Sequence, residues 1–189
     1  MATYRGLRRA FRLLNRFFMV PAFRSGLGAA MVTPPSGYIM VLSTIGHKSG
    51  KLRHTPVNYA LIDGDVYCIA GFGEVAHWAK NLAAIPEAEV QLPAGRFWGR
   101  VQVVTDGAER LRIARQILKN AGFAGFFFGF NPFTTRDEKL ARGIAGVPVL
   151  RITPVRVLPA AFDPGGSGWI VSTLGWIVLA ALLIAALAS

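Results

Sequence analysis

Cysteine is almost absent from this 189-residue chain, since Cys68 is the only one. A single cysteine forms no disulfide within the chain, so nothing here requires an oxidising compartment. Cys68 lies in an apolar run, residues 66–70, and no base stands beside it in the sequence. We therefore expect a buried strand residue and not a reactive thiol.

Acidic residues are also scarce: 10 Asp and Glu stand against 21 Lys and Arg, giving a net charge of +11. Nucleic acid is a weak explanation for this charge, because the basic residues concentrate beside membrane-seeking apolar ones. The three histidines, His47, His54 and His77, lack the paired spacing of a zinc site, so no metal is expected. No repeat or heptad pattern occurs either.

The N-terminal residues 5–24 carry arginines among large apolar side chains. Leu7, Phe11, Leu14 and Phe18 follow a spacing of i, i+4, i+7 and i+11, which predicts an amphipathic helix ending before Pro21. Two interpretations stay open. The helix lies on an anionic lipid surface, or it packs on its own domain and turns a basic face outward.

Residues 169–188 contain no charged side chain, which predicts a single transmembrane helix. Residues 159–168 before it are rich in glycine and read as a flexible linker. Arg151 and Arg156 precede the span and no basic residue follows it, so the positive-inside rule predicts a single-pass membrane protein with its globular part in the cytoplasm.

Between these ends, the pattern predicts a mainly β domain with some helix. Short apolar runs at residues 38–45, 53–57 and 66–70 are joined by tight turns, so we expect an antiparallel meander. Another hairpin is expected at residues 88–105, and a last strand, at an edge, at 147–157 because of its prolines. Helices are expected at residues 77–84, 106–120 and 137–143. The predicted parts are residues 1–36 (basic helix and loop), 37–158 (barrel domain), 159–168 (linker) and 169–188 (membrane helix).

The most informative stretch is a basic turn between the first two strands. His47, Lys48, Ser49, Gly50 and Lys51 follow a glycine and place several cations, a hydroxyl and clustered backbone amides at the rim of a sheet. This is the chemistry of an anion site. The alternative is a solvated hairpin turn whose lysines keep a sheet edge soluble.

Two further motifs are less specific. Residues 71–76 match G-x-G-x-x-A, but a dinucleotide fingerprint needs parallel strands, and the meander argues against them. Residues 123–133 contain six phenylalanines, which fit a lid over an apolar pocket, a loop dipping into lipid, or ordinary core packing.

Residues 43–86 resemble the deazaflavin (F420)-dependent nitroreductase and quinone reductase family. The likeness is carried by G-H-K-S-G-K-L-R at residues 46–53, T-P at 55–56, D-G at 63–64, A-G at 70–71, and W-A-K-N-L at 78–82 with Pro86. The resemblance extends over about residues 38–151. It implies a split β-barrel, an FMN-binding-like β-roll, with flanking helices.

The same resemblance implies a cofactor site for coenzyme F420. His47, Lys48, Ser49, Gly50 and Arg53 would hold the phosphate, although the family usually has arginine where His47 stands. The residues expected to border the deazaflavin ring are Pro56, Val57, Asn58, Ala70, Gly71, Trp78 and Asn81. Asn58 and the Phe-rich stretch replace tyrosines of the mycobacterial members, so the proton donor is not transferable and no catalytic residue is named.

The sequence hypothesis is a membrane-tethered oxidoreductase that passes a hydride from reduced deazaflavin to an apolar acceptor, such as a quinone or nitro compound. One alternative keeps the fold and exchanges the ligand for FMN or haem. Another is a non-catalytic lipid- or fatty-acid-binding module. Membrane lipid is an expected partner and nucleic acid is not, and the sequence leaves open whether a second copy completes the groove in a homodimer.

Overall fold

The fold was examined in a computed structural model of the chain. The residues whose structure is described are 13–24, 27–33, 36–71, 76–93, 95–122, 125–126, 131–159 and 168–188. Several predicted segments therefore fall outside them: the start of the N-terminal helix, the centre of the G-x-G-x-x-A motif, most of the Phe-rich stretch and most of the linker. Of the Phe-rich stretch, Phe126 and Phe133 are described, and both are exposed.

The first three strands of the barrel are antiparallel, as the turn pattern predicted. They are β1 (Ile39–Ile45), β2 (Leu52–Ile62) and β3 (Asp65–Ile69). Asp63 and Gly64 join β2 to β3, and both have positive φ, at 51° and 84°. Two such residues in succession form the hairpin turn whose twist matches that of the flanking strands. The short link thus fixes the register in which Ile62 pairs with Asp65.

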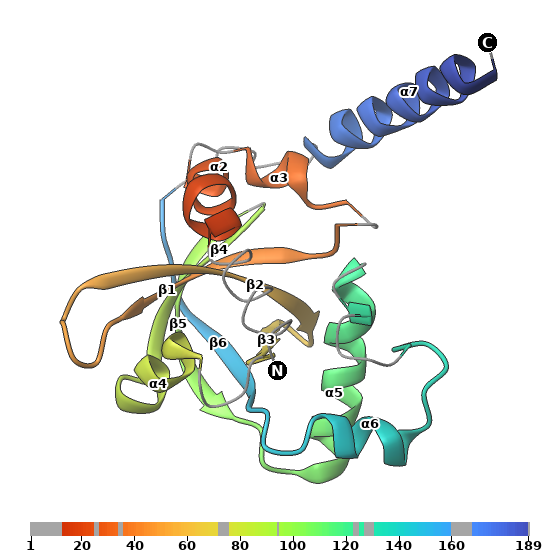
Figure 1. The fold of residues 1–189 in the computed structure, drawn as a ribbon. Helices are drawn as coiled ribbons and strands as arrows, with labels where there is room; N and C mark the ends of the chain where they lie inside the picture. The colour runs from red at the N-terminus through yellow and green to blue at the C-terminus, as the bar shows by residue number, and fades with distance from the viewer. Residues whose placement is uncertain are drawn as a thin grey trace.

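Three more strands close the sheet on itself. These are β4 (Glu87–Leu92), β5 (Gly95–Val103) and β6 (Val149–Val157), and the strand order is β1-β2-β3-β6-β5-β4 with β4 returning to β1. All pairings are antiparallel. Figure 1 shows the six strands with helices around them. The prediction of a mainly β barrel with flanking helices is confirmed.

The predicted edge position of the last strand is wrong. β6 lies between β3 and β5 and pairs with both. Its Pro154 stands opposite Gly99 and its Arg156 opposite Trp98, so Val155 is an extra residue that bulges from β6. A bulge leaves the ladder locally irregular, which lets an interior strand tolerate a residue that has no N–H to donate.

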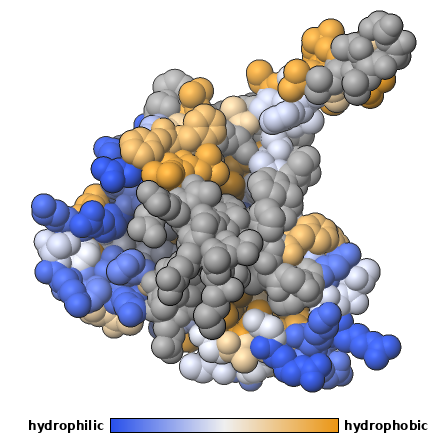
Figure 2. Space-filling view, viewed as in Figure 1, coloured by the Kyte–Doolittle hydropathy of each residue, from blue (hydrophilic) through white to orange (hydrophobic). Residues whose placement is uncertain are grey.

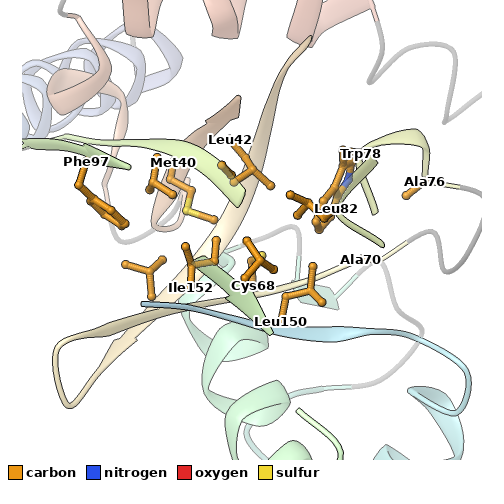
Figure 3. Close-up of a cluster of buried hydrophobic side chains, with 14 residues drawn as sticks. Met40, Leu42, Cys68, Ala70, Ala76, Trp78, Leu82, Phe97, Leu150 and Ile152 are labelled. Atoms are coloured by element: carbon orange, nitrogen blue, oxygen red, sulfur yellow. The ribbon is translucent and has the colours of Figure 1, made fainter. Parts of the chain in front are cut away.

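The barrel interior is a continuous apolar core. Figure 3 shows Met40 and Leu42 of β1 facing Cys68 of β3 and Ile152 of β6, as expected when alternate residues of each strand point inward. One end of this core is covered by α4 (His77–Ala84), which contributes Trp78 and Leu82. The helix was predicted with these bounds, and it ends just before Pro86.

A second apolar cluster attaches α5 (Gly107–Asn120) and α6 (Asp137–Gly143) to the outside of the barrel. Both helices have the predicted positions. Asp106 caps α5, because its Oδ1 accepts a hydrogen bond from the backbone N–H of Glu109 at 2.7 Å. On the buried face, Ile113 lies in the core, whereas Leu111 at its margin is only half-buried.

The N-terminal helix continues past the proline at which it was expected to end. A π-helical turn, η1 (Asn15–Met19), leads into α2 (Val20–Arg24), and α3 (Gly28–Met31) follows. Pro21 stands in the first turn of α2. Its missing N–H is tolerated there, because the change from π to α hydrogen bonding leaves that position without an obligatory partner.

This helix both packs on the barrel and carries an exposed apolar surface. Met19 and Phe23 are buried with Val32 and Val41. The described members of the predicted apolar face, Leu14 and Phe18, are instead exposed, together with Leu13, Phe17 and Leu27. Of the two interpretations of the sequence, packing of the helix on its own domain is confirmed, and contact with lipid stays a prediction.

Residues 168–188 form one helix, α7 (Gly168–Ala188), which begins against α3 and extends away from the barrel (Figure 1). Within the described part of the chain, no helix combines the length and the apolarity needed to cross a membrane. The transmembrane helix expected at residues 169–188 is therefore not found.

Candidate anion-binding site

The backbone of the turn between β1 and β2 is held by internal hydrogen bonds. The N–H of Gly46 donates to the carbonyl of Lys51 (2.9 Å), while the N–H groups of Ser49 and Gly50 donate to the carbonyl of Gly46 (3.1 and 2.8 Å). Gly50 has φ +62°, and a Cβ there would meet nothing within 4 Å, so glycine is present for its backbone conformation alone. These bonds hold His47 and Lys48 at the tip of the hairpin.

No acidic side chain within the described ranges forms an ion pair with the basic side chains of this turn. Lys48, Lys51 and Arg53 are exposed. The ion pairs found among the described residues join Arg96 to Glu89, Arg115 to Asp137 and Arg151 to Asp65, and none involves the turn. Figure 2 shows hydrophilic residues gathered over this end of the hairpin. Three unneutralised cations beside a hydroxyl and a glycine turn suit a phosphate or carboxylate ligand.

The turn is attached to α4 by one buried amide. Asn81 Oδ1 accepts the backbone N–H of His47 at 3.1 Å and lies 2.9 Å from His47 Nδ1. Asn81 Nδ2 donates to Thr44 Oγ1 at 3.0 Å. Asn81 and Thr44 are almost fully buried, whereas His47 is exposed. Asn81 thus fixes the exposed turn on the barrel.

The other two histidines lie apart from this amide. His54 Nδ1 is 2.8 Å from Ser43 Oγ, and His77 is exposed at the start of α4. The pKa of His54 is lowered, chiefly by burial and then by the positive charge of Arg24, with Glu89 acting in the opposite direction. His54 is therefore held neutral in a structural pair with a buried serine.

The residues expected to border the ring do not share one face. Val57 packs toward the barrel core, so its neighbours Pro56 and Asn58 point the other way, as alternation along β2 requires. Asn58 Nδ2 donates to the carbonyl of Tyr38 at 3.2 Å. A planar ligand on either face of β2 meets only part of this set through side chains, and the ring-binding role of these residues stays a prediction.

Two more of these residues are part of the core. Ala70 is completely buried, and Trp78 packs beside Leu82 inside the barrel cluster (Figure 3). Gly71 is half-exposed after β3, and its N–H donates to the carbonyl of Ile69. Sequence reasoning missed Thr44, which holds the amide of Asn81. A threonine within an apolar strand gives no signal of that contact.

No group of His, Cys, Asp and Glu within the described ranges is arranged to hold a metal ion. Likewise, the described strands near the G-x-G-x-x-A motif are antiparallel, which is the wrong setting for a dinucleotide fingerprint. Fold and site together define a small β-barrel protein with an exposed basic turn.

A family model identifies the barrel. Residues 19–125, more than half of the chain, match the model described as F420H(2)-dependent quinone reductase, and the chain belongs to that family. It is therefore an oxidoreductase, and its coenzyme is the deazaflavin F420. Membership of this family favours F420 over FMN or haem as the ligand, and an enzyme over a non-catalytic module. A search of the curated proteins gives no match.

Several solved structures are similar to the chain. The conserved hypothetical protein Rv2991 from Mycobacterium tuberculosis is 20% identical, with 70% of this chain and 86% of that one covered and a TM-score of 0.48. HutZ, a heme storage protein from Vibrio cholerae, is 14% identical, with 71% of this chain and 91% of that one covered and a TM-score of 0.46. An F420-H2 dependent reductase is 19% identical, with 60% of this chain and 92% of that one covered and a TM-score of 0.43. The family assignment rests on the family model and not on these scores.

Proposed function

We propose that the protein reduces an apolar, quinone-like acceptor at the expense of reduced F420, and that the turn Gly46–Lys51 with Arg53 holds the charged part of the coenzyme. The observation that carries this proposal is the cluster of Lys48, Lys51 and Arg53. It is exposed, lies on a hydrogen-bonded turn and forms no ion pair with the acidic residues that the structure describes. When bound, the coenzyme supplies the hydride chemistry. The turn residues bind its phosphate and so position it against the barrel.

The residues fit an anionic group of this kind. Gly50 leaves open space where a side chain would stand, so a phosphate oxygen can approach the backbone. The Ser49 hydroxyl lies near the backbone N–H of Lys51, at 3.5 Å. Lysine and arginine donors on a phosphate form charge-assisted hydrogen bonds, the stronger class in proteins.

The Lys48→Ala variant tests the placement of the coenzyme. Loss of one charge-assisted contact costs about 1.5–3 kcal/mol, so we expect the dissociation constant for F420 to rise roughly ten- to a hundredfold. Fluorescence titration at fixed ionic strength measures it. Lys139→Ala is the matched control, because Lys139 lies in α6, on the other side of the barrel in Figure 1. Equal affinities of both variants would place the coenzyme elsewhere.

An exposed apolar surface supports an apolar acceptor and contact with lipid. Phe17 and Phe18 of η1 project to solvent beside Arg16, whose guanidinium lies 5.4 Å from the Phe17 ring centre. Aromatic side chains with arginines between them suit the interface of an anionic bilayer. Such a bilayer also dissolves quinones, so binding to it would bring the enzyme to its acceptor.

Acceptor class and lipid contact are tested separately. Reduced F420 should be oxidised rapidly with a lipophilic quinone, and turnover of a soluble acceptor but not of quinones would contradict the acceptor class. In flotation with anionic vesicles, Phe17→Ser with Phe18→Ser should release most of the protein, whereas Phe133→Ser, a change at another exposed ring, should not. Equal flotation of both variants would show that η1 is not the lipid contact.

A further inference from the structure

The contacts of Asn81 determine where His47 carries its proton. The backbone N–H of His47 can only donate, so the atom of Asn81 that it meets at 3.1 Å is the amide oxygen. That choice is supported by Thr44, whose hydroxyl accepts from the amide nitrogen on the other side. The orientation of the buried amide is therefore set by a backbone group.

The amide oxygen in turn fixes the tautomer of the imidazole. His47 Nδ1 lies 2.9 Å from the same oxygen, which carries no hydrogen, so Nδ1 must be the donor. A neutral His47 then has its lone pair on Nε2. No hydrogen bond to Nε2 occurs among the described residues, and His47 is exposed beside Lys48.

From this geometry we propose that His47 binds the anionic group of the coenzyme only as an imidazolium, so that coenzyme binding takes up a proton. A neutral ring would turn a lone pair toward an anion, which repels it. A second proton on Nε2 makes both ring nitrogens donors and adds a positive charge. Asn81 is a positioning residue in this arrangement. The inference rests on the proposed placement of the coenzyme at this turn.

Several charged and titratable groups lie on the elements around His47. Among the described residues they are Lys48 and Lys51 of the turn, Arg53, His54 and Tyr59 of β2, and His77 and Lys80 of α4. Lysine and arginine stay charged between pH 5.5 and 8.5 as a rule, which leaves the histidines. The chain has only three of them, so each can be replaced in turn.

The test is the dissociation constant of oxidised F420 between about pH 5.5 and 8.5 at constant ionic strength. Affinity of the unmodified protein should fall as pH rises, by up to about tenfold per pH unit, because only the doubly protonated ring binds the anion. Calorimetry in two buffers of different ionisation enthalpy should show proton uptake on binding. His47→Arg should bind with a flat profile, because its charge does not titrate. His77→Gln should keep the profile of the unmodified protein.

The Asn81→Asp variant tests whether residue 81 influences the protonation of His47 or only holds the turn in place. This change keeps an acceptor for Nδ1 and adds a negative charge that favours the imidazolium, so the fall in affinity should move to higher pH. An unchanged pH profile in His47→Arg, or binding without proton uptake, would overturn the inference. In either case, weakened binding by Lys48→Ala would still support the proposed site. No effect of Lys48→Ala would instead overturn the site itself.

Discussion

Burial decides the chemistry of two titratable side chains in this barrel. The thiol of Cys68 is fully buried, and that burial raises its pKa to about 12, which leaves almost no thiolate near neutral pH. His54 is affected in the opposite direction, because burial disfavours the charged form of a base and lowers its pKa. Neither group is available for chemistry in the folded protein, as the sequence predicted for the cysteine.

The lowered pKa of His54 makes stability depend on pH. The unfolded chain protonates this histidine more readily than the folded one, so the free energy of unfolding should fall as pH drops below about 6.5. Urea denaturation at pH 5 and 7.5 measures the difference. His54→Gln should reduce it, whereas His77→Gln, at an exposed position, should not. An equal loss of stability in all three proteins would mean that other groups cause it.

At the level of single residues, the sequence predicts the local part of the site and misses the distant part. The turn with Lys48 and Gly50 can be predicted from the sequence because its six residues are consecutive. The contact of Asn81 with His47 joins positions 34 residues apart, and the resemblance assigned both to direct ligand contacts. Only the packing of α4 on the barrel reveals the contact between the two.

Strands and helices were predicted where local signals define them. The Asp-Gly turn, the Asp106 cap and the spacing within α5 depend on neighbours in sequence, so these elements have nearly the expected bounds. The position of β6 in the sheet depends on partners far away in the chain. Its prolines indicate an edge unless the bulge at Val155 is known, and that bulge appears only in the pairing of β6 with β5.

Gly99 lies on β5 opposite that bulge and should tolerate no side chain. A Cβ there would lie 2.7 Å from Ile152 Cγ2 and 3.1 Å from the carbonyl of Thr153, so Gly99→Ala should destabilise the barrel by about 1–3 kcal/mol. Gly107→Ala is the control, because nothing lies within 4 Å of its added Cβ and alanine favours the start of α5. Chemical denaturation that shows equal stabilities would contradict the packing at the bulge.

For the whole molecule, the net charge of +11 should speed the capture of an anionic coenzyme. Raising the salt concentration from about 50 to 500 mM shortens the range of this attraction, so the association rate of F420 should fall by roughly tenfold. Stopped-flow fluorescence measures the rate. The dissociation rate should change less, and an association rate independent of salt would show that the charge plays no part in capture.

Closure of the barrel by β6 also governs the order in which the chain can fold during its synthesis. β3 and β5 both pair with β6, and this strand is the last of the six to leave the ribosome. Until then, a nascent chain holds an open sheet whose two free edges can pair with other chains. Fragments that stop before residue 149 should therefore need chaperones to stay unaggregated, whereas chains that include β6 close without them.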